Sequence, residues 1–192
     1  MRLNVWRVVA FFLLIVLSVG FGFAFDAAAT AMERHNHPRP TEFAEAIKQN
    51  AEDYGIPEAI LWATANTGSG FASNAVSSDG RVGLMQLTPA QFSFISEELL
   101  GKETPDAGLL YDPETNLQCG AAWLSYLYER YDIWELVYVA YHTGTETVDT
   151  WLSDPEYTDN GVLTEIPDKE AAQYAETMQK AVETYRKLYY ET

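Results

Sequence analysis

The apolar positions of the chain follow helical spacing over most of its length. Between residues 41 and 54, Phe43, Ile47 and Ala51 recur at four-residue intervals. This spacing matches one buried face of an α-helix, and Gly55 provides a stop signal directly after it. The hydrophobic pattern therefore predicts a helix over residues 41–54, with Thr41 as its possible cap.

Start and stop signals of the same kind predict five further helices. They begin at Pro57, Thr88, Asp112, Asp132 and Pro167 and end near residues 66–68, 100, 131, 140 and 189, respectively. Only residues 75–87 lack helical spacing, and the turn Ser78-Asp79-Gly80 within them favours a small β-hairpin. The pattern as a whole predicts a mostly α domain.

An uncharged apolar run precedes this domain. It covers 18 residues, Val8–Phe25, with Arg2 and Arg7 before it and Asp26 after it. Basic residues followed by such a run form an export signal, and 18 residues at a rise of 1.5 Å can just span a bilayer core of about 30 Å. Because the core of an ordinary signal peptide has about 7–15 residues, an uncleaved membrane anchor is favoured. The alanines after Asp26 keep cleavage open.

The chain is therefore expected to have three parts. Residues 1–25 form a signal peptide or signal anchor, residues 26–40 form a linker, and residues 41–192 form the main domain. Pro38 and Pro40 stiffen the linker and oppose helix formation there. The main domain is expected outside the cytoplasmic membrane, either anchored in it or secreted.

Charge and composition exclude several classes of function. The chain carries 28 acidic and 12 basic residues and has a net charge of −16, so it repels nucleic acid and anionic headgroups. Binding to an anionic cell wall must then come from a specific groove. No motif for a metal, a nucleotide or a nucleophile elbow is present, and no cofactor is expected. The single cysteine, Cys119, excludes an intramolecular disulfide and is expected to be a small buried hydrophobe.

Four sequence patches carry a family resemblance. They are Tyr54-Gly55-Ile56-Pro57 with Leu61-Trp62-Ala63, the stretch from Ser69-Gly70-Phe71 through Gly83-Leu84-Met85-Gln86 to Pro89, Asp112–Leu117 with Gly120, and Ala140-Tyr141-His142-Thr143-Gly144 with Trp151. In this order and spacing they resemble the lytic transglycosylases of the soluble (SLT) type, which have a lysozyme-like fold. A weaker match around Ile166-Pro167, Lys169-Glu170 and Tyr174 resembles the closing helix of that family.

The resemblance implies a groove that binds peptidoglycan glycan strands. Its expected substrate-binding residues, carried over position by position, are Ser77, Met85, Gln86, Tyr141 and His142. Ser77 and Gln86 offer hydrogen bonds to a sugar chain, and Met85 is expected in the core or the groove wall. In the family, the residue matching Tyr141 lies beside the catalytic carboxylate. A packed tyrosine with a satisfied hydroxyl is the alternative interpretation.

The acid of the family is absent from this chain. The family normally reads Glu-Ser-Gly-Phe where this chain reads Gly68-Ser69-Gly70-Phe71. That Glu protonates the oxygen between N-acetylmuramic acid and N-acetylglucosamine and then accepts the proton of the 6-hydroxyl, which closes a 1,6-anhydro ring. General acid–base catalysis contributes about 10²–10⁴-fold, so catalysis is expected to be impaired. Gly68 is also expected to stop its helix in the left-handed conformation.

A second departure leaves alternatives open. The family loop Tyr-Asn-Ala-Gly-Pro-Gly reads Tyr141-His142-Thr143-Gly144-Thr145-Glu146 here. Glu146, tuned by His142, is an alternative acid that would make the protein an active lytic transglycosylase, although Glu146 can also be read as an ordinary solvated residue. A membrane-anchored module that binds a cell-wall protein in the groove is another option. A hydrolase that pairs Glu146 with Asp149 or Asp79 is a further one.

Overall fold

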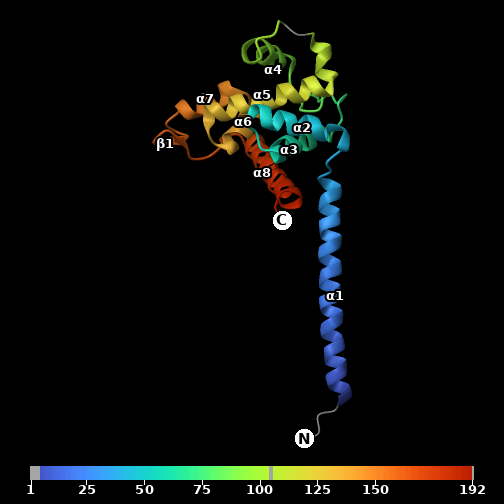
Figure 1. Cartoon of the computed structure of the whole chain (residues 1–192). Coiled ribbons are helices and arrows are strands. Elements are labelled where there is room, and N and C mark those ends of the chain that lie inside the picture. Colours follow the sequence, from blue (N-terminus) through green and yellow to red (C-terminus); the bar gives the residue numbers. More distant parts are fainter. Residues whose placement is uncertain (1–4, 104–105, 192) are drawn as a thin grey trace. The chain divides into compact units, whose positions relative to one another are not determined.

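The computed structural model of the chain describes residues 5–103 and 106–191 and divides into two compact units, residues 1–38 and 39–192. The first unit holds one helix, α1 (Val5–Asn36) (Figure 1). Within the described residues one segment is long and apolar enough to cross a membrane: Val16–Asn36, with 21 residues and a mean hydropathy of 1.2. The predicted linker is therefore helical as far as Asn36, and the break with its two prolines comes only at residues 37–40.

The second unit is built mostly of helices. They are α2 (Thr41–Tyr54), α3 (Glu58–Ser69), α4 (Pro89–Phe94), α5 (Pro113–Tyr131), α6 (Trp134–Thr143), α7 (Thr145–Ser153) and α8 (Lys169–Tyr189). A π-helical turn, Ile95–Leu99, extends α4, and a 3-10 turn, Ala107–Tyr111, precedes α5. The strands β1 (Thr158–Asp159) and β2 (Val162–Leu163) pair in antiparallel fashion. The predicted mostly α fold is confirmed.

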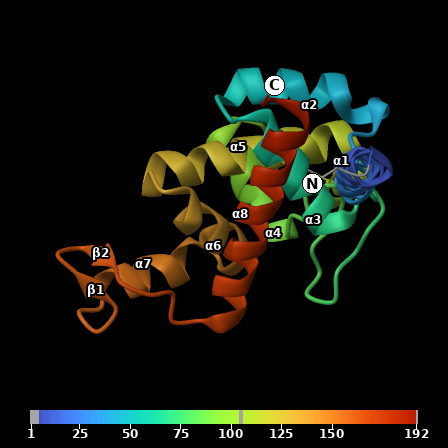
Figure 2. The same cartoon turned by 90° about the horizontal axis from the view of Figure 1, so that it is seen from below.

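The helices pack around one hydrophobic core. Figure 2 shows α8 crossing the middle of the domain, and α8 packs against both α3 and α6. The long helix α5 packs against α2 and α6. The largest core side chains include Leu61 and Trp62 of α3, Leu117 and Leu124 of α5, and Tyr185 of α8, all essentially unexposed. Since each such side chain contributes about 1.5–3 kcal/mol on burial, the core holds α3 firmly in place.

Local sequence signals place most helix ends correctly. Gly55 ends α2 with a left-handed φ of 65°. Thr88 and Gln91 form a reciprocal capping box at the start of α4, and the Asp112 carboxylate caps α5. Asp132 is an exception, because it ends α5 with a φ of 55° instead of capping α6. A short polar side chain such as that of Asp tolerates this left-handed conformation.

Two segments differ from the sequence-based expectation. Residues 75–87 hold only the isolated bridges Val76–Val82 and Val82–Leu87, and the two-stranded hairpin lies at β1 and β2 instead. The helix α7 was not predicted from spacing. It follows directly on Gly144, whose φ of 92° turns the chain sharply from α6 into α7.

The single cysteine is a buried core residue, as the sequence predicts. Cys119 is 1% exposed, and burial raises the pKa of its thiol to about 11. Because the thiolate is the reactive form, this thiol is inert near neutral pH. The next residue, Gly120, lies so close to Met85 that a Cβ at Gly120 would come within 2.7 Å of Met85 Cγ. This contact brings α5 directly against the loop that carries Met85.

A buried amide fixes the same loop. Asn116 is completely buried, and its Oδ1 accepts a hydrogen bond from the Met85 N–H at 2.7 Å. Its Nδ2 donates to the carbonyl oxygens of Val82 at 3.0 Å and Leu110 at 2.8 Å. Gly83 has a φ of 81°, and a Cβ there would lie 2.3 Å from both Asn116 Nδ2 and the Leu110 oxygen. The loop conformation therefore requires both the asparagine and the glycine.

Arg39, the first residue of the second unit, is held against α3 and the end of α8 by its guanidinium group. The Arg39 guanidinium lies 5.0 Å from the ring centroid of Trp62, 5.1 Å from that of Tyr189 and 5.2 Å from that of Tyr190. It also pairs with Glu58 at 3.5 Å. Such cation–π contacts are each worth about 0.5–2 kcal/mol, so the chain is held where it enters the domain.

Candidate functional site

One groove of the second unit gathers the residues that the sequence singles out. Its volume is about 410 Å³, and it lies between the end of α3, the loop of residues 77–86, the end of α6 and the start of α8. The lining residues are Thr64, Thr67, Gly68, Ser77, Ser78, Asp79, Arg81, Met85, Gln86, Tyr141, His142, Glu170 and Tyr174. The five predicted substrate-binding residues and position 68 therefore share one site.

Gly68 lies in the last turn of α3 with an ordinary right-handed backbone. The left-handed stop is Gly70, with a φ of 58°, so the prediction that Gly68 ends the helix is wrong. A Cβ built at Gly68 would lie 3.2 Å from Gln86 Cγ. A side chain at this position would therefore stand against the Gln86 side of the groove, on a backbone that any L-residue adopts.

The loop of residues 77–86 brings a cation into the groove. Arg81 Nε donates to Asp79 Oδ2 at 2.8 Å, and Nη1 and Nη2 donate to the carbonyl oxygens of Tyr141 at 3.3 Å and His142 at 2.6 Å. The Ser77 hydroxyl donates to the Asp79 carboxylate and accepts from the Arg81 N–H at 2.9 Å. The hydrogen bonds from Ser77 and Arg81 hold the pKa of Asp79 below its ordinary value, so Asp79 is ionised at neutral pH.

Two of the predicted binding residues also hold the groove together. Tyr141 is 3% exposed, its hydroxyl donates to the Met85 carbonyl at 2.7 Å, and burial raises its pKa well above the ordinary value. Gln86 has a φ of 54°, and its Nε2 donates to the carbonyls of Gly83 at 2.8 Å and Ala75 at 3.3 Å. The Tyr141 hydroxyl is thus satisfied by the protein, and Gln86 keeps its Oε1 as an acceptor.

Helix α8 closes the groove from the far end of the sequence. The His142 ring stacks on Tyr174 with centroids 4.6 Å apart and an interplanar angle of 15°. Glu170 is exposed on the first turn of α8 and lines the same groove. The groove therefore contains two carboxylates, Asp79 and Glu170, and neither stands at position 68.

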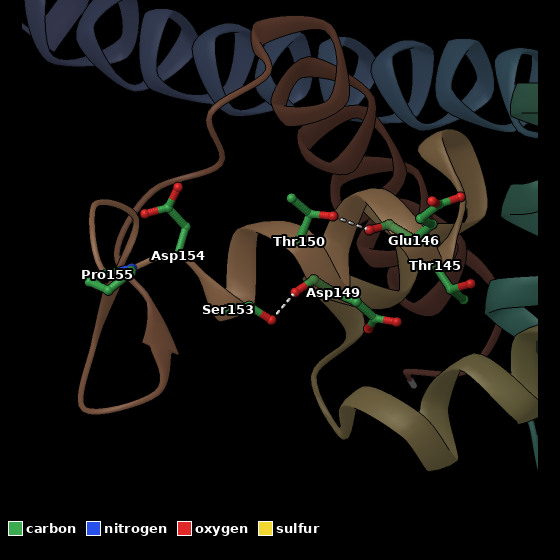
Figure 3. A pocket seen from close by; sticks show the side chains of 7 residues that line it. All are labelled: Thr145, Glu146, Asp149, Thr150, Ser153, Asp154 and Pro155. Carbon is green, nitrogen blue, oxygen red and sulfur yellow. Dashed lines mark hydrogen bonds between the residues drawn. The ribbon is translucent and has the colours of Figure 1, made fainter.

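Glu146, the predicted substitute acid, lies outside this groove. It is exposed on the first turn of α7 and lines a separate hollow with Thr145, Asp149, Thr150, Ser153, Asp154 and Pro155 (Figure 3). The two hollows share no lining residue. The turn at Gly144 explains the separation, because it starts a new helix directly after the groove wall of α6.

Asp149, the carboxylate suggested as a partner of Glu146, already accepts hydrogen bonds from two neighbouring side chains. Asp149 Oδ2 accepts from Arg130 Nη2 at 2.5 Å, and Asp149 Oδ1 accepts from the Tyr131 hydroxyl at 3.0 Å. The Arg130 hydrogen bond holds the pKa of Asp149 below its ordinary value. Asp149 is therefore held in its ionised form and cannot be the proton donor of a hydrolase that pairs it with Glu146.

The transglycosylase SLT domain model matches residues 45–161, more than half of the chain. The chain belongs to this family. Membrane-bound lytic murein transglycosylase C from Edwardsiella ictaluri is 30% identical over 115 residues, which cover 58% of this chain and 32% of that protein. This SLT-family chain thus spans about a third of the length of that relative.

Solved structures agree with the family assignment. An inactive mutant of lytic transglycosylase Slt from Pseudomonas aeruginosa matches 77% of this SLT-family chain and 24% of its own, with a TM-score of 0.66 and 26% identity. The 70 kDa soluble lytic transglycosylase from Escherichia coli shares the fold, with a TM-score of 0.70 and 24% identity over 81% of this chain and 25% of its own. The predicted lysozyme-like arrangement is confirmed.

The sequence assigned no groove role to several lining residues of this SLT domain, among them Arg81, Glu170 and Tyr174. Arg81 lies between Gly80 and Gly83 inside the most specific motif, so its position could have identified it. Glu170 and Tyr174 were matched to the closing helix without a role. They reach the groove only because α8 packs back against α3 and α6, which spacing along the chain does not reveal.

Proposed function

We propose that this protein binds peptidoglycan glycan strands in the groove and cleaves them at most slowly. It is a cell-envelope protein of lytic transglycosylase type by family. The observation that supports the proposal is a groove that has the predicted binding residues on its walls and is also lined by Gly68, the residue that we assign to the position of the family's acid. The chain would then act as a wall-binding module or as a competitor that shields strands from active enzymes.

Neither carboxylate of the groove has the surroundings that a general acid needs. A general acid needs a raised pKa, which apolar surroundings provide. Gly68 has no side chain, and Asp79 is held in its ionised form by Ser77 and Arg81. Glu170 is exposed to solvent on the first turn of α8, so it lacks apolar surroundings. The arrangement favours binding over bond cleavage.

A groove occupied by a protein partner is the competing interpretation. Filling of the groove by Trp62 or Phe71 would have favoured it. Trp62 is fully buried in the core, and Phe71 packs against Phe43 and Trp62 at centroid distances of 6.1 and 5.8 Å. Neither ring lines the groove. A cleft of hydroxyl, amide and aromatic groups that remains open suits a sugar chain better.

The N-terminal helix supports a place in the cell envelope. Val16–Asn36 is long enough to cross a bilayer, and the relative from Edwardsiella ictaluri is named membrane-bound. We infer that the second unit is held at the outer face of the cytoplasmic membrane, or is secreted where the segment is cleaved.

Co-sedimentation with insoluble peptidoglycan tests the proposed function. The full chain in detergent micelles should sediment with the wall material, with no anhydro-muropeptides in the supernatant by mass spectrometry. Thr67→Trp places a large ring in the groove, so we expect roughly tenfold weaker binding, the effect of about 1.4 kcal/mol. Thr150→Trp in the separate hollow is the matched control and should bind as wild type does. Equal binding by both variants would place the wall contact elsewhere.

Two single substitutions test the relocated-acid alternative. Because Glu146 lies outside the groove, we expect Glu146→Gln to equal wild type in the release of anhydro-muropeptides. Glu170→Gln removes the exposed carboxylate inside the groove and should also leave release at background. A wild-type chain that releases product, and loses this activity in only one of the two variants, would identify that residue as the acid.

A further inference from the structure

The cation in the groove is fixed and faces inward. The Arg81 side chain is 16% exposed, whereas that of its partner Asp79 is 59% exposed. Solvent and salt screen an exposed charge more than a covered one, so Asp79 compensates the guanidinium only in part. The bonds from Arg81 to the carbonyl oxygens of Tyr141 and His142 prevent the side chain from swinging out. The groove wall therefore holds a fixed guanidinium group whose charge Asp79 offsets only in part.

Gly68 and the Arg81 guanidinium lie in the same groove. Both line the groove of about 410 Å³, and a Cβ at Gly68 points toward Gln86, which belongs to the loop that carries Arg81. The charge of Arg81 also acts on the hydroxyl groups of Tyr141 and Tyr174, which lie on two other walls of the groove. Burial raises the pKa of both Tyr141 and Tyr174, and Arg81 opposes this rise in each case.

We propose that Arg81 is a second residue that sets the chemistry of the groove, because its charge would keep a carboxyl group introduced at position 68 ionised. The proposal rests on the proposed glycan-binding function and adds a specificity-determining residue to it. A cation near a carboxyl group stabilises the charged form, whereas the acid of a lytic transglycosylase must hold a proton. Restoring Glu at position 68 therefore does not by itself restore a proton donor near neutral pH.

The other groups around position 68 do not cancel this effect. The charged and titratable lining residues are Asp79 and Arg81 of the loop, Tyr141 and His142 of α6, and Glu170 and Tyr174 of α8. The residues from α3, Thr64 and Thr67, are uncharged. The Asp79 side chain is 59% exposed and Glu170 is exposed too, so solvent screens these two charges more than that of Arg81, whose side chain is 16% exposed. Among the lining residues Arg81 is the one Lys or Arg.

The test measures the pKa of the introduced carboxyl group directly. Gly68→Glu is made in the full chain, alone and combined with Arg81→Gln, Arg81→Lys or Arg130→Gln. The carboxyl signal is followed by ¹³C NMR between pH 3 and 8 and is assigned by difference from Gly68→Gln. Arg130 pairs with Asp149 outside the groove, so it serves as the matched cation control. Arg81→Met is a second neutral variant in case Arg81→Gln does not fold.

We expect Arg81→Gln to raise the pKa of the introduced carboxyl by about 1–3 units, the usual effect of a neighbouring cation. The rate of anhydro-muropeptide release at pH 7 should rise about tenfold for each unit, because the protonated fraction rises by that factor. Arg81→Lys keeps the charge and should leave both quantities close to those of Gly68→Glu alone. Arg130→Gln should change neither.

Two results would overturn the proposal. One is an unchanged carboxyl pKa after Arg81→Gln or Arg81→Met. The other is the same shift in Arg81→Lys as in Arg81→Gln, since this would assign the effect to packing and not to charge. The NMR titration needs no bound glycan, so it decides the role of Arg81 even if the groove fails to bind peptidoglycan. Loss of wall binding in the co-sedimentation assay bears on the proposed function alone.

Discussion

A glutamate in place of Gly68 should turn the binding groove into a cleaving one once the pH is low enough to protonate it. At mildly acidic pH we expect Gly68→Glu to release 1,6-anhydro-muropeptides about 10²-fold or more faster than wild type, the scale of general acid–base catalysis. The new Cβ would lie 3.2 Å from Gln86 Cγ, a side-chain atom that can move slightly. Gly68 is helical, and replacing a helical glycine recovers up to about 1 kcal/mol. Mass spectrometry of digested wall material measures the product.

Gly68→Gln is the control for this experiment. It adds the same number of side-chain atoms at the same place but no titratable group, so product release should stay at the wild-type level. If Gly68→Glu and Gly68→Gln are equally inactive at every pH, and remain so with Arg81→Gln, the groove lacks more than its acid. The interpretation as a glycan cradle without a proton donor would then fail.

Replacement of Asn116 by Ala should give the largest loss of stability among single changes near the groove. It removes three hydrogen bonds to the backbone groups of Met85, Val82 and Leu110, all in the interior. An orphaned buried group costs about 1–3 kcal/mol, so we expect the free energy of unfolding to fall by about 3–5 kcal/mol. Urea unfolding followed by circular dichroism measures this difference.

A second asparagine provides the matched control. Asn50 on α2 is half-buried and donates one hydrogen bond, at 2.8 Å, to the carbonyl oxygen of Ala46. Asn50→Ala should cost about 1 kcal/mol or less, the usual net value of one such bond. Similar losses for Asn116→Ala and Asn50→Ala would show that Asn116 does not organise the loop of residues 77–86.

Most of the fold could be predicted because the helix signals are local. The signals at Gly55, Thr88 and Asp112 act within one helical turn, and the structure places helix ends at them as expected. Asp132 misled the prediction because an aspartate can either start a helix or end one with a left-handed backbone. The helix α7 was missed because it starts directly after Gly144 and has no capping side chain to signal its beginning.

The groove could be predicted only in part. The motif placed Ser77, Gln86 and Tyr141 on one site because these residues match the family directly. Burial decides which of them are free to act, and only the structure shows that the Tyr141 hydroxyl is already bonded to the Met85 carbonyl. Glu170 enters the groove through the packing of α8, about a hundred residues away in sequence.

The short connection between the two units limits where the protein can work. Helix α1 ends at Asn36 and the second unit begins at Arg39, so only His37 and Pro38 join them. Two extended residues cover at most about 7 Å, and the contacts of Arg39 leave no slack on the far side. With α1 in the bilayer, this short connection would restrict the domain to the glycan strands nearest the membrane. Glycan strands in more distant layers would stay beyond the reach of the groove.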